Sequence, residues 1–214
     1  MSAVQAFVDF VLHLDRHLDG ILRDFGGWTY GILALIVFCE TGLVILPLLP
    51  GDSLLFAAGS VAARGALDPW ALFGGLALAA IVGDNVNYWI GRRIGPRAFS
   101  GTVRFLRLEH LERTRAFFAK HGARTIVLAR FIPIIRTFTP FVAGVGAMPY
   151  GRFLAYDIGG GVVWVGLFVW AGFFFGNLPV VHRNFSIVIM AIIIISALPM
   201  ILELVRSRRG NAPG

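Results

Sequence analysis

The chain has 214 residues, of which 57% are hydrophobic and only 14% are charged, and its formal net charge is +7. A soluble domain is typically about 45–50% apolar and about 25% charged, and a domain of this size has too little interior to bury the excess. The composition therefore indicates an integral membrane protein and excludes a cytosolic enzyme, a secreted disulfide scaffold and a disordered chain. At about 20 residues per segment, the length allows one bundle of roughly five to seven membrane-embedded segments.

Apolar runs predict seven segments in chain order. Residues 4–25 read as an amphipathic helix, 70–90 as a membrane span, 103–120 as a basic amphipathic helix, and 153–176 and 185–205 as two further spans. Two other apolar segments are interrupted by polar residues and helix breakers: 28–63 by Glu40, Pro47, Pro50, Gly51 and Asp52, and 125–148 by Arg130, Pro133, Arg136 and Pro140. We expect an all-α membrane protein with two broken segments.

The net positive charge lies in one region. Residues 91–124 contain nine basic residues and two acidic ones, which accounts for the whole excess. A short basic loop between hydrophobic segments is typical of the cytoplasmic side of a membrane, where it faces anionic lipid headgroups. The C-terminal tail carries Arg206, Arg208 and Arg209. We therefore place residues 91–124 and the C-terminus in the cytoplasm and expect no nucleic-acid partner.

Three apolar segments lie between these two cytoplasmic regions, and three full crossings would put the regions on opposite sides. One segment must therefore enter and leave by the same face. Residues 125–148 are the best candidate, because prolines break the helix ladder and irregular backbone at membrane depth is tolerated only inside protein or beside a water-filled cavity. We predict that 125–148 is a re-entrant helical hairpin.

The first half follows the same logic. The second arm of 28–63, residues 53–63, is only about 16 Å long as a helix and cannot cross a hydrocarbon core of about 30 Å. Short motifs also recur, since residues 56–59 (FAAG) resemble residues 141–144 (FVAG). We predict one membrane domain (1–214) made of an inverted repeat: a first repeat, 1–91, with a hairpin at 28–63, and a second, 92–176, with a hairpin at 125–148. A C-terminal span, 185–205, follows. Whether the first arm of 28–63 crosses fully stays open.

Glu40, Asp52, Arg130 and Arg136 form the most informative set of residues. An isolated charge at the bilayer centre costs about 2.5–3.5 kcal/mol on insertion scales, so such groups usually pair and mark a transport pathway. Arginine presents a planar fork of donors that fits phosphate. A carboxylate in apolar surroundings takes up a proton readily once its cation leaves. The four residues therefore predict either a proton-linked anion site or a static ion-pair cluster that only joins the two hairpins.

Further polar residues lie in the spans. Asp84, Asn87 and Tyr88 share one helix face by their spacing, and either interhelical hydrogen bonding or lining of the pathway would explain them. No nucleotide-binding loop, zinc motif or nucleophile elbow is present. We expect no enzyme activity, no cofactor and no metal.

The motifs together resemble the DedA family of bacterial inner-membrane proteins, also grouped as VTT-domain or SNARE-associated Golgi proteins. The resemblance covers about residues 26–205 and rests on four motifs: Glu40-Thr41-Gly42, Leu49-Pro50-Gly51-Asp52, Gly83-Asp84 through Asn87-Tyr88-Trp89 to Gly91-Arg92, and Arg130-Phe131-x-Pro133-x-x-Arg136 with Pro140 and Ala143-Gly144.

The resemblance implies two facing re-entrant hairpins, dependence on the proton motive force and a role in envelope integrity. Some members are translocases that return undecaprenyl phosphate to the cytoplasmic leaflet, and eukaryotic relatives are phospholipid scramblases. The family's essential acids fall on Glu40 and Asp52, and its essential arginines on Arg130 and Arg136. Where many members carry asparagine early in the penultimate span, this chain has Asp157.

We therefore predict a bacterial inner-membrane flippase for undecaprenyl phosphate. Arg130 and Arg136 would bind the phosphate, Glu40 and Asp52 would carry the proton, and Asp84, Asn87, Tyr88 and Asp157 would line the pathway. Its partners would be an anionic lipid, protons and the bilayer. Three alternatives stay open: a non-selective phospholipid scramblase, a proton-coupled transporter of small solutes, and a structural membrane protein whose charges form only a static ion-pair cluster. The oligomeric state is not predicted.

Overall fold

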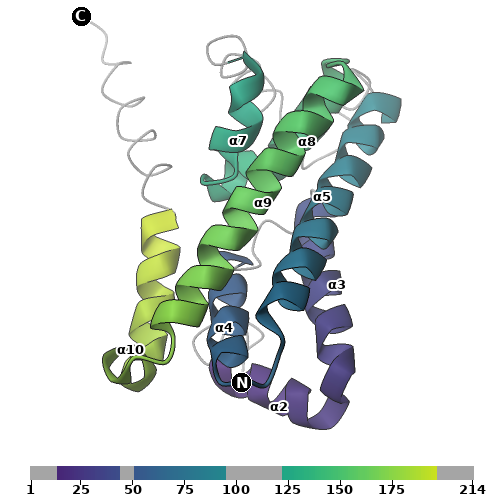
Figure 1. The fold of residues 1–214 in the computed structure, drawn as a ribbon. Coiled ribbons are helices and arrows are strands. Elements are labelled where there is room, and N and C mark those ends of the chain that lie inside the picture. The colour runs from purple at the N-terminus through teal and green to yellow at the C-terminus, as the bar shows by residue number, and fades with distance from the viewer. Residues whose placement is uncertain (1–13, 44–50, 95–121, 197–214) are drawn as a thin grey trace, which may run out of the picture.

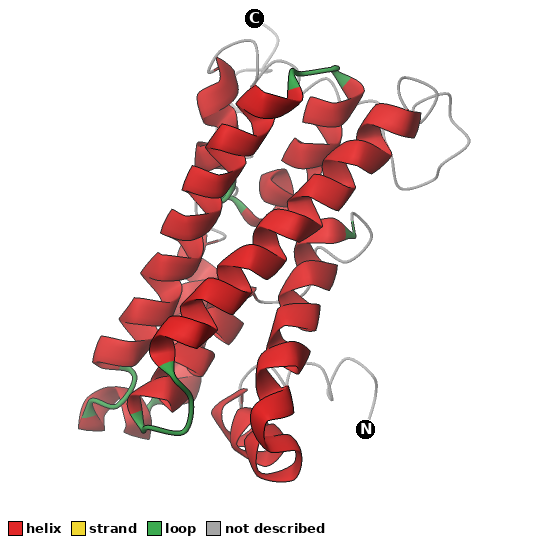
Figure 2. Ribbon diagram, turned by 45° about the vertical axis from the view of Figure 1, so that its right-hand side comes forward, coloured by secondary structure: helices red, strands yellow, loops and turns green. Residues whose placement is uncertain are grey.

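A computed structural model describes residues 14–43, 51–94 and 122–196, and all the regular structure in these ranges is helical (Figures 1 and 2). In chain order the helices are α2 (Leu14–Phe25), the 3₁₀ turn η1 (Gly26–Trp28), α3 (Thr29–Gly42), α4 (Gly51–Ala63), α5 (Pro69–Ile94), η3 (Gly122–Arg124), α7 (Thr125–Ala129), α8 (Pro133–Val145), α9 (Tyr150–Phe175) and α10 (Pro179–Arg183). A further apolar helix covers Phe185–Ser196. The prediction of an all-α membrane protein is confirmed.

Within the described ranges, three helical stretches are long and apolar enough to cross a membrane: His17–Gly42, Pro69–Ile94 and Tyr150–Phe175. The first joins α2, η1 and α3, and Gly26 at its turn has a positive φ of 53°. The other two are α5 and α9, each 26 residues, or about 39 Å long. The predicted spans at 70–90 and 153–176 are confirmed as helices and are somewhat differently bounded, at 69–94 and 150–175.

Both predicted breaks lie next to local helix signals. α4 begins at Gly51, directly after Pro50, and α8 begins with Pro133 at its first turn, where a proline's missing N–H costs nothing. Pro140, however, lies inside α8, so the prediction that it interrupts the helix is wrong. The hydroxyl of the neighbouring Thr139 donates to the carbonyl of Ile135 at 2.7 Å, whereas the carbonyl that loses its helical donor to Pro140 is that of Arg136.

α5 and α9 run the length of the molecule, and the short helices fill the space beside them. In Figure 1, α3 and α4 occupy the lower half and α7 and α8 the upper half, so the two pairs come from opposite ends toward the middle. α4 packs on α9, α8 packs on α5, α3 packs on α5 and α7 packs on α9. Each long helix therefore contacts one arm of each broken segment.

The contact between α4 and α9 is made by two glycines. A Cβ at Gly59 would collide with the carbonyl oxygen of Val169, and a Cβ at Gly172 would collide with the carbonyl oxygen of Phe56. Small residues at such positions let membrane helices approach closely. The two backbones are in direct contact here, so neither glycine can be replaced without moving a helix.

The contact between α5 and α8 is built in the same way. A Cβ at Gly144 would collide with the carbonyl oxygen of Tyr88, and a Cβ at Gly91 would collide with that of Phe141. Both contacts have the same spacing. On each helix, the glycine lies three residues after the residue whose carbonyl oxygen faces the glycine of the other helix. The recurring Phe-x-Ala-Gly motif thus has the same packing role in α4 and in α8.

Aromatic pairs mark the two ends of the long helices. Trp70 and Trp170 lie edge to face at 4.8 Å between ring centroids, and Trp89 and Tyr150 lie 5.4 Å apart. The helical rise separates Trp70 from Trp89 by about 29 Å and Tyr150 from Trp170 by about 30 Å. This matches the hydrocarbon thickness of a bilayer, and such aromatic residues are enriched at its two interfaces. We therefore expect the membrane boundaries of the bundle at these two pairs.

Some predictions fall outside the described residues. These are the basic amphipathic helix at 103–120 with most of the basic region 91–124, the first part of the helix at 4–25, the bend of the first hairpin at 44–50 and the end of the span at 185–205.

Candidate functional site

The buried charges form two clusters, each built around one arginine. In the first, Arg136 in the first turn of α8 is paired with Glu40 near the end of α3 and with Asp52 in the first turn of α4. Its Nη1 donates to Asp52 Oδ1 at 2.6 Å, and its Nη2 donates to Glu40 Oε1. The guanidinium therefore joins both arms of the first broken segment to the second.

Trp164 of α9 completes this cluster. Its indole N–H donates to Asp52 Oδ1 at 2.9 Å, and the Arg136 guanidinium lies over its ring at 4.9 Å from the centroid. A desolvated cation over a tryptophan face gains about 2 kcal/mol. Gly51 gives the cluster room, because a Cβ there would collide with the Glu40 carboxylate. This is the physical reason for glycine in the Pro-Gly-Asp motif.

The first cluster is not fully satisfied. Glu40 Oε2 and Arg136 Nε are buried without a hydrogen-bond partner among the described residues. Buried polar atoms are nearly always paired. Glu40 Oε2 therefore has room to bind a proton, and Arg136 Nε is able to donate a hydrogen bond to an anion.

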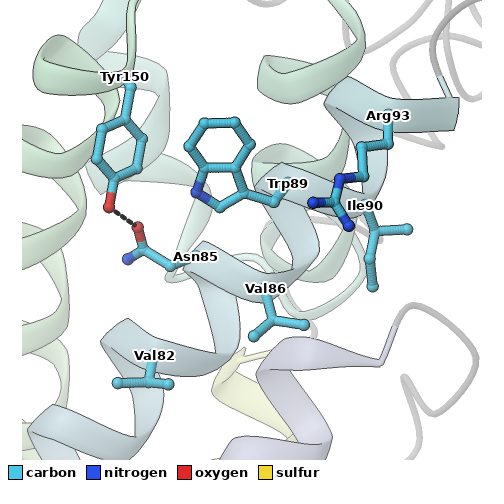
Figure 3. A pocket seen from close by; sticks show the side chains of 7 residues that line it. All are labelled: Val82, Asn85, Val86, Trp89, Ile90, Arg93 and Tyr150. Carbon is cyan, nitrogen blue, oxygen red and sulfur yellow. Dashed lines mark hydrogen bonds between the residues drawn. The ribbon is translucent and has the colours of Figure 1, made fainter.

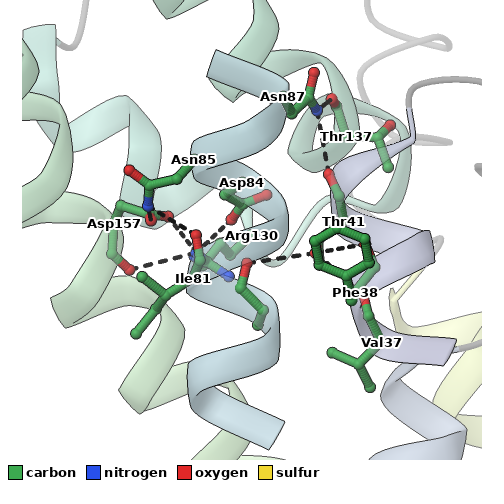
Figure 4. A network of polar contacts seen from close by, with 11 residues as sticks. Val37, Phe38, Thr41, Ile81, Asp84, Asn85, Asn87, Arg130, Thr137 and Asp157 are labelled. Atoms are coloured by element: carbon green, nitrogen blue, oxygen red, sulfur yellow. Dashed lines mark hydrogen bonds and ion pairs between the residues drawn. The ribbon is translucent and has the colours of Figure 1, made fainter. Parts of the chain in front are cut away.

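In the second cluster, Arg130 follows α7 and is paired with Asp84 of α5 and Asp157 of α9 (Figure 4). All three side chains are almost completely buried. Asn85 donates to the other oxygen of Asp157 at 3.2 Å. Arg130 Nε, like Arg136 Nε, has no partner among the residues that the structure describes.

Two consecutive glycines of α9 form the wall of the second cluster. A Cβ at Gly160 would lie 3.0 Å from Cδ of Arg130, and one at Gly161 would lie 3.4 Å from its Nη2. The glycines let the arginine side chain lie directly against the α9 backbone. Gly160 and Gly161 therefore serve the close packing of a charged group, whereas a Cβ at Gly159 would meet nothing within 4 Å.

The two clusters lie at different depths. Asp157 and Trp164 are on the same face of α9, about 10 Å apart along the helix. Measured along α9, Asp157 is about 10 Å from the Tyr150 boundary and Trp164 about 9 Å from the Trp170 boundary. Arg130 follows α7 and Arg136 belongs to α8, so the two arginines lie beside α9 at different depths. They share no ion-paired carboxylate among the described residues.

Each cluster holds more carboxylates than arginines. Glu40 and Asp52 both pair with Arg136, and Asp84 and Asp157 both pair with Arg130. With every group ionised each cluster carries one excess negative charge. Charge buried away from water is costly, so each cluster has a place for one proton.

The remaining predicted residues have structural contacts. Asn87 donates to the carbonyl of Thr41 in α3 at 3.1 Å and to that of Thr137 in α8 at 2.8 Å, which joins an arm of each broken segment to α5 (Figure 4). Tyr88 is fully buried, stacks on Phe153 and donates to the carbonyl of Met148 at 2.5 Å. Asp84, Asn87 and Tyr88 do share the buried face of α5, but only Asp84 contacts a charged cluster.

Trp164 is the site residue whose role the sequence analysis missed. A tryptophan in an apolar span gives no signal of its own, and its contact with Asp52 depends on how α4 packs against α9. Within the described residues no group of His, Cys, Asp and Glu side chains is arranged to hold a metal ion.

An all-α bundle with aromatic boundaries and two buried arginine–carboxylate clusters defines a class of polytopic membrane proteins with ionisable groups inside the bilayer. The family comparison agrees with this description, because the VTT-domain model matches residues 49–174. The chain belongs to the VTT-domain family, which includes DedA.

Three relatives illustrate the similarity. The chain is 47% identical to the protein DedA of Escherichia coli (strain K12) over 99% of this chain and 98% of that protein. It is 48% identical to a membrane protein of Mycobacterium tuberculosis over 86% of this chain and 82% of the relative. The inner membrane protein YqjA of Escherichia coli (strain K12) is 34% identical over 72% and 70% of the two chains. No solved structure matches the chain.

Proposed function

We propose that this protein is a lipid transporter of the bacterial inner membrane that moves undecaprenyl phosphate from the outer to the inner leaflet with protons. The observation that carries the proposal is that each of two buried arginines faces two carboxylates inside the bilayer. A merely neutral ion pair would need only one carboxylate for each arginine.

The chemistry couples an anion to a proton. Arg130 and Arg136 bind the phosphate, because a guanidinium presents parallel donors that fit two phosphate oxygens. An arginine that turns to the phosphate leaves its carboxylates without a cation, and in apolar surroundings they then bind protons. In the first cluster Glu40 and Asp52 carry this proton. The anion and the proton then move together with little net charge crossing the membrane.

The depth of the clusters supports a stepwise path. Arg130 and Arg136 are two phosphate-binding positions beside one face of α9, at different distances from the two aromatic boundaries. The isoprenoid tail stays in the surrounding lipid, so only a phosphate headgroup needs to pass between them. We assign Asp84 and Asp157 to the transport path. Asn87 and Tyr88 instead hold the surrounding helices together.

We further propose that the bundle is an inverted repeat with its site between the halves, as in many secondary transporters. The like-built contacts Gly59–Gly172 and Gly144–Gly91 support this division, because each joins one repeat's short helix to the other repeat's long helix. The opposite approach of α3–α4 and α7–α8 in Figure 1 also supports it.

Reconstitution tests the function directly. Purified protein is placed in vesicles with fluorescently labelled undecaprenyl phosphate or labelled phosphatidylcholine, with and without a pH gradient. We expect movement of the polyprenyl phosphate that a gradient accelerates and little movement of phosphatidylcholine. Equal, gradient-independent movement of both lipids would identify a scramblase, and no movement of either would refute lipid transport.

Arg136→Lys is the matched variant in this assay. Lysine keeps the charge but cannot bridge Asp52 and Glu40 and still bind phosphate with two parallel donors. Losing one charge-assisted hydrogen bond costs about 1.5–3 kcal/mol, so we expect the transport rate to fall by about tenfold or more. A normal rate in this variant, together with a normal rate in Arg130→Ala, would rule out the phosphate role.

A charge exchange separates a transport site from a static ion-pair cluster. The structure pairs Glu40 with Arg136, so the informative double variant is Glu40→Arg with Arg136→Glu. A static cluster tolerates the exchange, because the opposite charges remain adjacent. A transport site loses activity, because the guanidinium then projects from α3. Recovered transport in the double variant would favour the structural alternative.

A further inference from the structure

A third charged feature, besides the two clusters, lies on the outer face of α5. A pocket of about 510 Å³ is lined by six residues of α5 and one of α9 (Figure 3): Val82, Asn85, Val86, Trp89, Ile90, Arg93 and Tyr150. The α5 residues recur at helical spacing and form one stripe along the helix. This stripe faces away from the protein core, and its apolar members Val82, Val86, Trp89 and Ile90 are all exposed.

The pocket straddles one membrane boundary. Trp89 and Tyr150 mark that boundary, and Arg93 lies one turn beyond it toward the aqueous side. Val82 lies about 10 Å on the other side of Trp89, in the acyl-chain region. An amphiphile in this pocket would therefore have its polar end at Arg93 and its chain along the two valines.

The polar end of the pocket is basic. Arg93 lies in the last turn of α5 and is exposed, and among the described residues it has no hydrogen-bond or ion-pair partner. In Figure 3 its guanidinium turns toward Trp89 and lies beside Ile90. An exposed guanidinium at the headgroup level of a membrane attracts anionic lipid.

The inner wall of the pocket adjoins the second cluster. Tyr150 donates to Asn85 Oδ1 at 2.8 Å, and Asn85 Nδ2 donates to Asp157 at 3.2 Å. Asp157 is in turn paired with Arg130. Two side chains, Asn85 and Asp157, therefore link the pocket to the buried arginine.

We propose that this pocket binds the phosphate headgroup of an anionic lipid from the leaflet at the Trp89 end, with Arg93 as its ligand. The apolar stripe favours a lipid over a soluble phosphate, since it provides a wall for the chain. Exchange of headgroups between this pocket and Arg130 rests on the proposed function, whereas lipid binding in the pocket does not.

Quenching of Trp89 fluorescence measures the lipid next to it. The full chain is reconstituted in phosphatidylcholine vesicles that contain a minor fraction of brominated phosphatidylglycerol or of brominated phosphatidylcholine. The signal of Trp89 is the difference between the protein and its Trp89→Phe variant. We expect about a fivefold preference of Trp89 for the anionic lipid, the effect of one arginine near an anionic headgroup.

Two variants make the test specific. Arg93→Gln should abolish the preference while quenching by brominated phosphatidylcholine persists, which shows that the variant is inserted. Arg152→Gln is the matched control, because Arg152 is an exposed arginine in the first turn of α9, at the same end of the bundle and outside the pocket. It should keep the preference.

The proposal is overturned if the unaltered protein shows no preference, or if Arg152→Gln removes it as fully as Arg93→Gln, since surface charge alone would then explain it. The transport assay is independent. If Trp89 prefers the anionic lipid but the protein transports no lipid, the lipid-binding pocket is supported and the proposed function is refuted. If the protein transports lipid but Trp89 shows no preference, the proposed function is supported and the pocket is refuted.

Discussion

Asp157 changes the charge of a buried site by a single side chain. With Asp84 it gives Arg130 two carboxylate partners. One carboxylate is enough to neutralise one guanidinium. The second adds a place for a proton, so the Arg130 cluster of this chain is able to bind one.

We therefore expect Asp157→Asn to fold and to transport at a rate close to that of the unaltered protein, with weaker dependence on the pH gradient. Asparagine still accepts from Asn85, and Asp84 still pairs with Arg130. The measurement is the transport rate at several imposed gradients. Loss of transport with normal folding would instead show that Asp157 is indispensable.

Arg130→Ala is the contrasting variant at the same cluster. It leaves Asp84 and Asp157 facing each other without a cation, and breaking a buried pair in this way costs about 3–5 kcal/mol. We expect a correspondingly lower free energy of unfolding in detergent, or protonation of both carboxyls with loss of transport. Unchanged stability together with unchanged transport would mean that the cluster has no role.

Between elements, the glycine contacts decide how closely the helices approach. Gly59 and Gly144 each face a carbonyl oxygen of the neighbouring long helix, so the obstacle to a Cβ is backbone and not a flexible side chain. Overpacking of this kind costs about 1–3 kcal/mol.

We expect Gly59→Ala and Gly144→Ala each to lower the free energy of unfolding by about 1–3 kcal/mol. Gly74→Ala and Gly159→Ala are the matched controls on α5 and α9, because a Cβ at either position meets nothing within 4 Å. They should be neutral or slightly stabilising, since alanine is a better helix former. Thermal unfolding in detergent measures all four, and equal effects would contradict the packing explanation.

For the whole molecule, the decisive property is the side of the membrane that each end faces. The chain has one cysteine, so a Cys39→Ala background accepts new labelling sites. Arg124→Cys and Gly151→Cys should both react with an impermeant maleimide from the cytoplasm, because α7 and α8 would enter and leave by the same face. Ala66→Cys, in the turn between α4 and α5, should react from the other side. Labelling of positions 124 and 151 from different sides would refute the re-entrant hairpin.

Much of the architecture could be predicted because it depends on local chemistry. Pro50-Gly51 and Pro133 mark the helix boundaries, since a proline lacks the N–H that continues a helix, and the apolar runs at α5 and α9 need only the hydrophobic effect of the bilayer. Pro140 shows the limit of such rules, because α8 continues through it.

The sequence by itself determined the membrane class, the two breaks and the four charged residues Glu40, Asp52, Arg130 and Arg136. These follow from composition and from the high cost of charge in lipid. Only the tertiary structure decided which arginine faces which carboxylates and that Trp164 and Asn85 belong to the clusters. Such pairings depend on the depth at which each helix meets its neighbour, and that depth is set by backbone contacts between helices that lie far apart in the sequence.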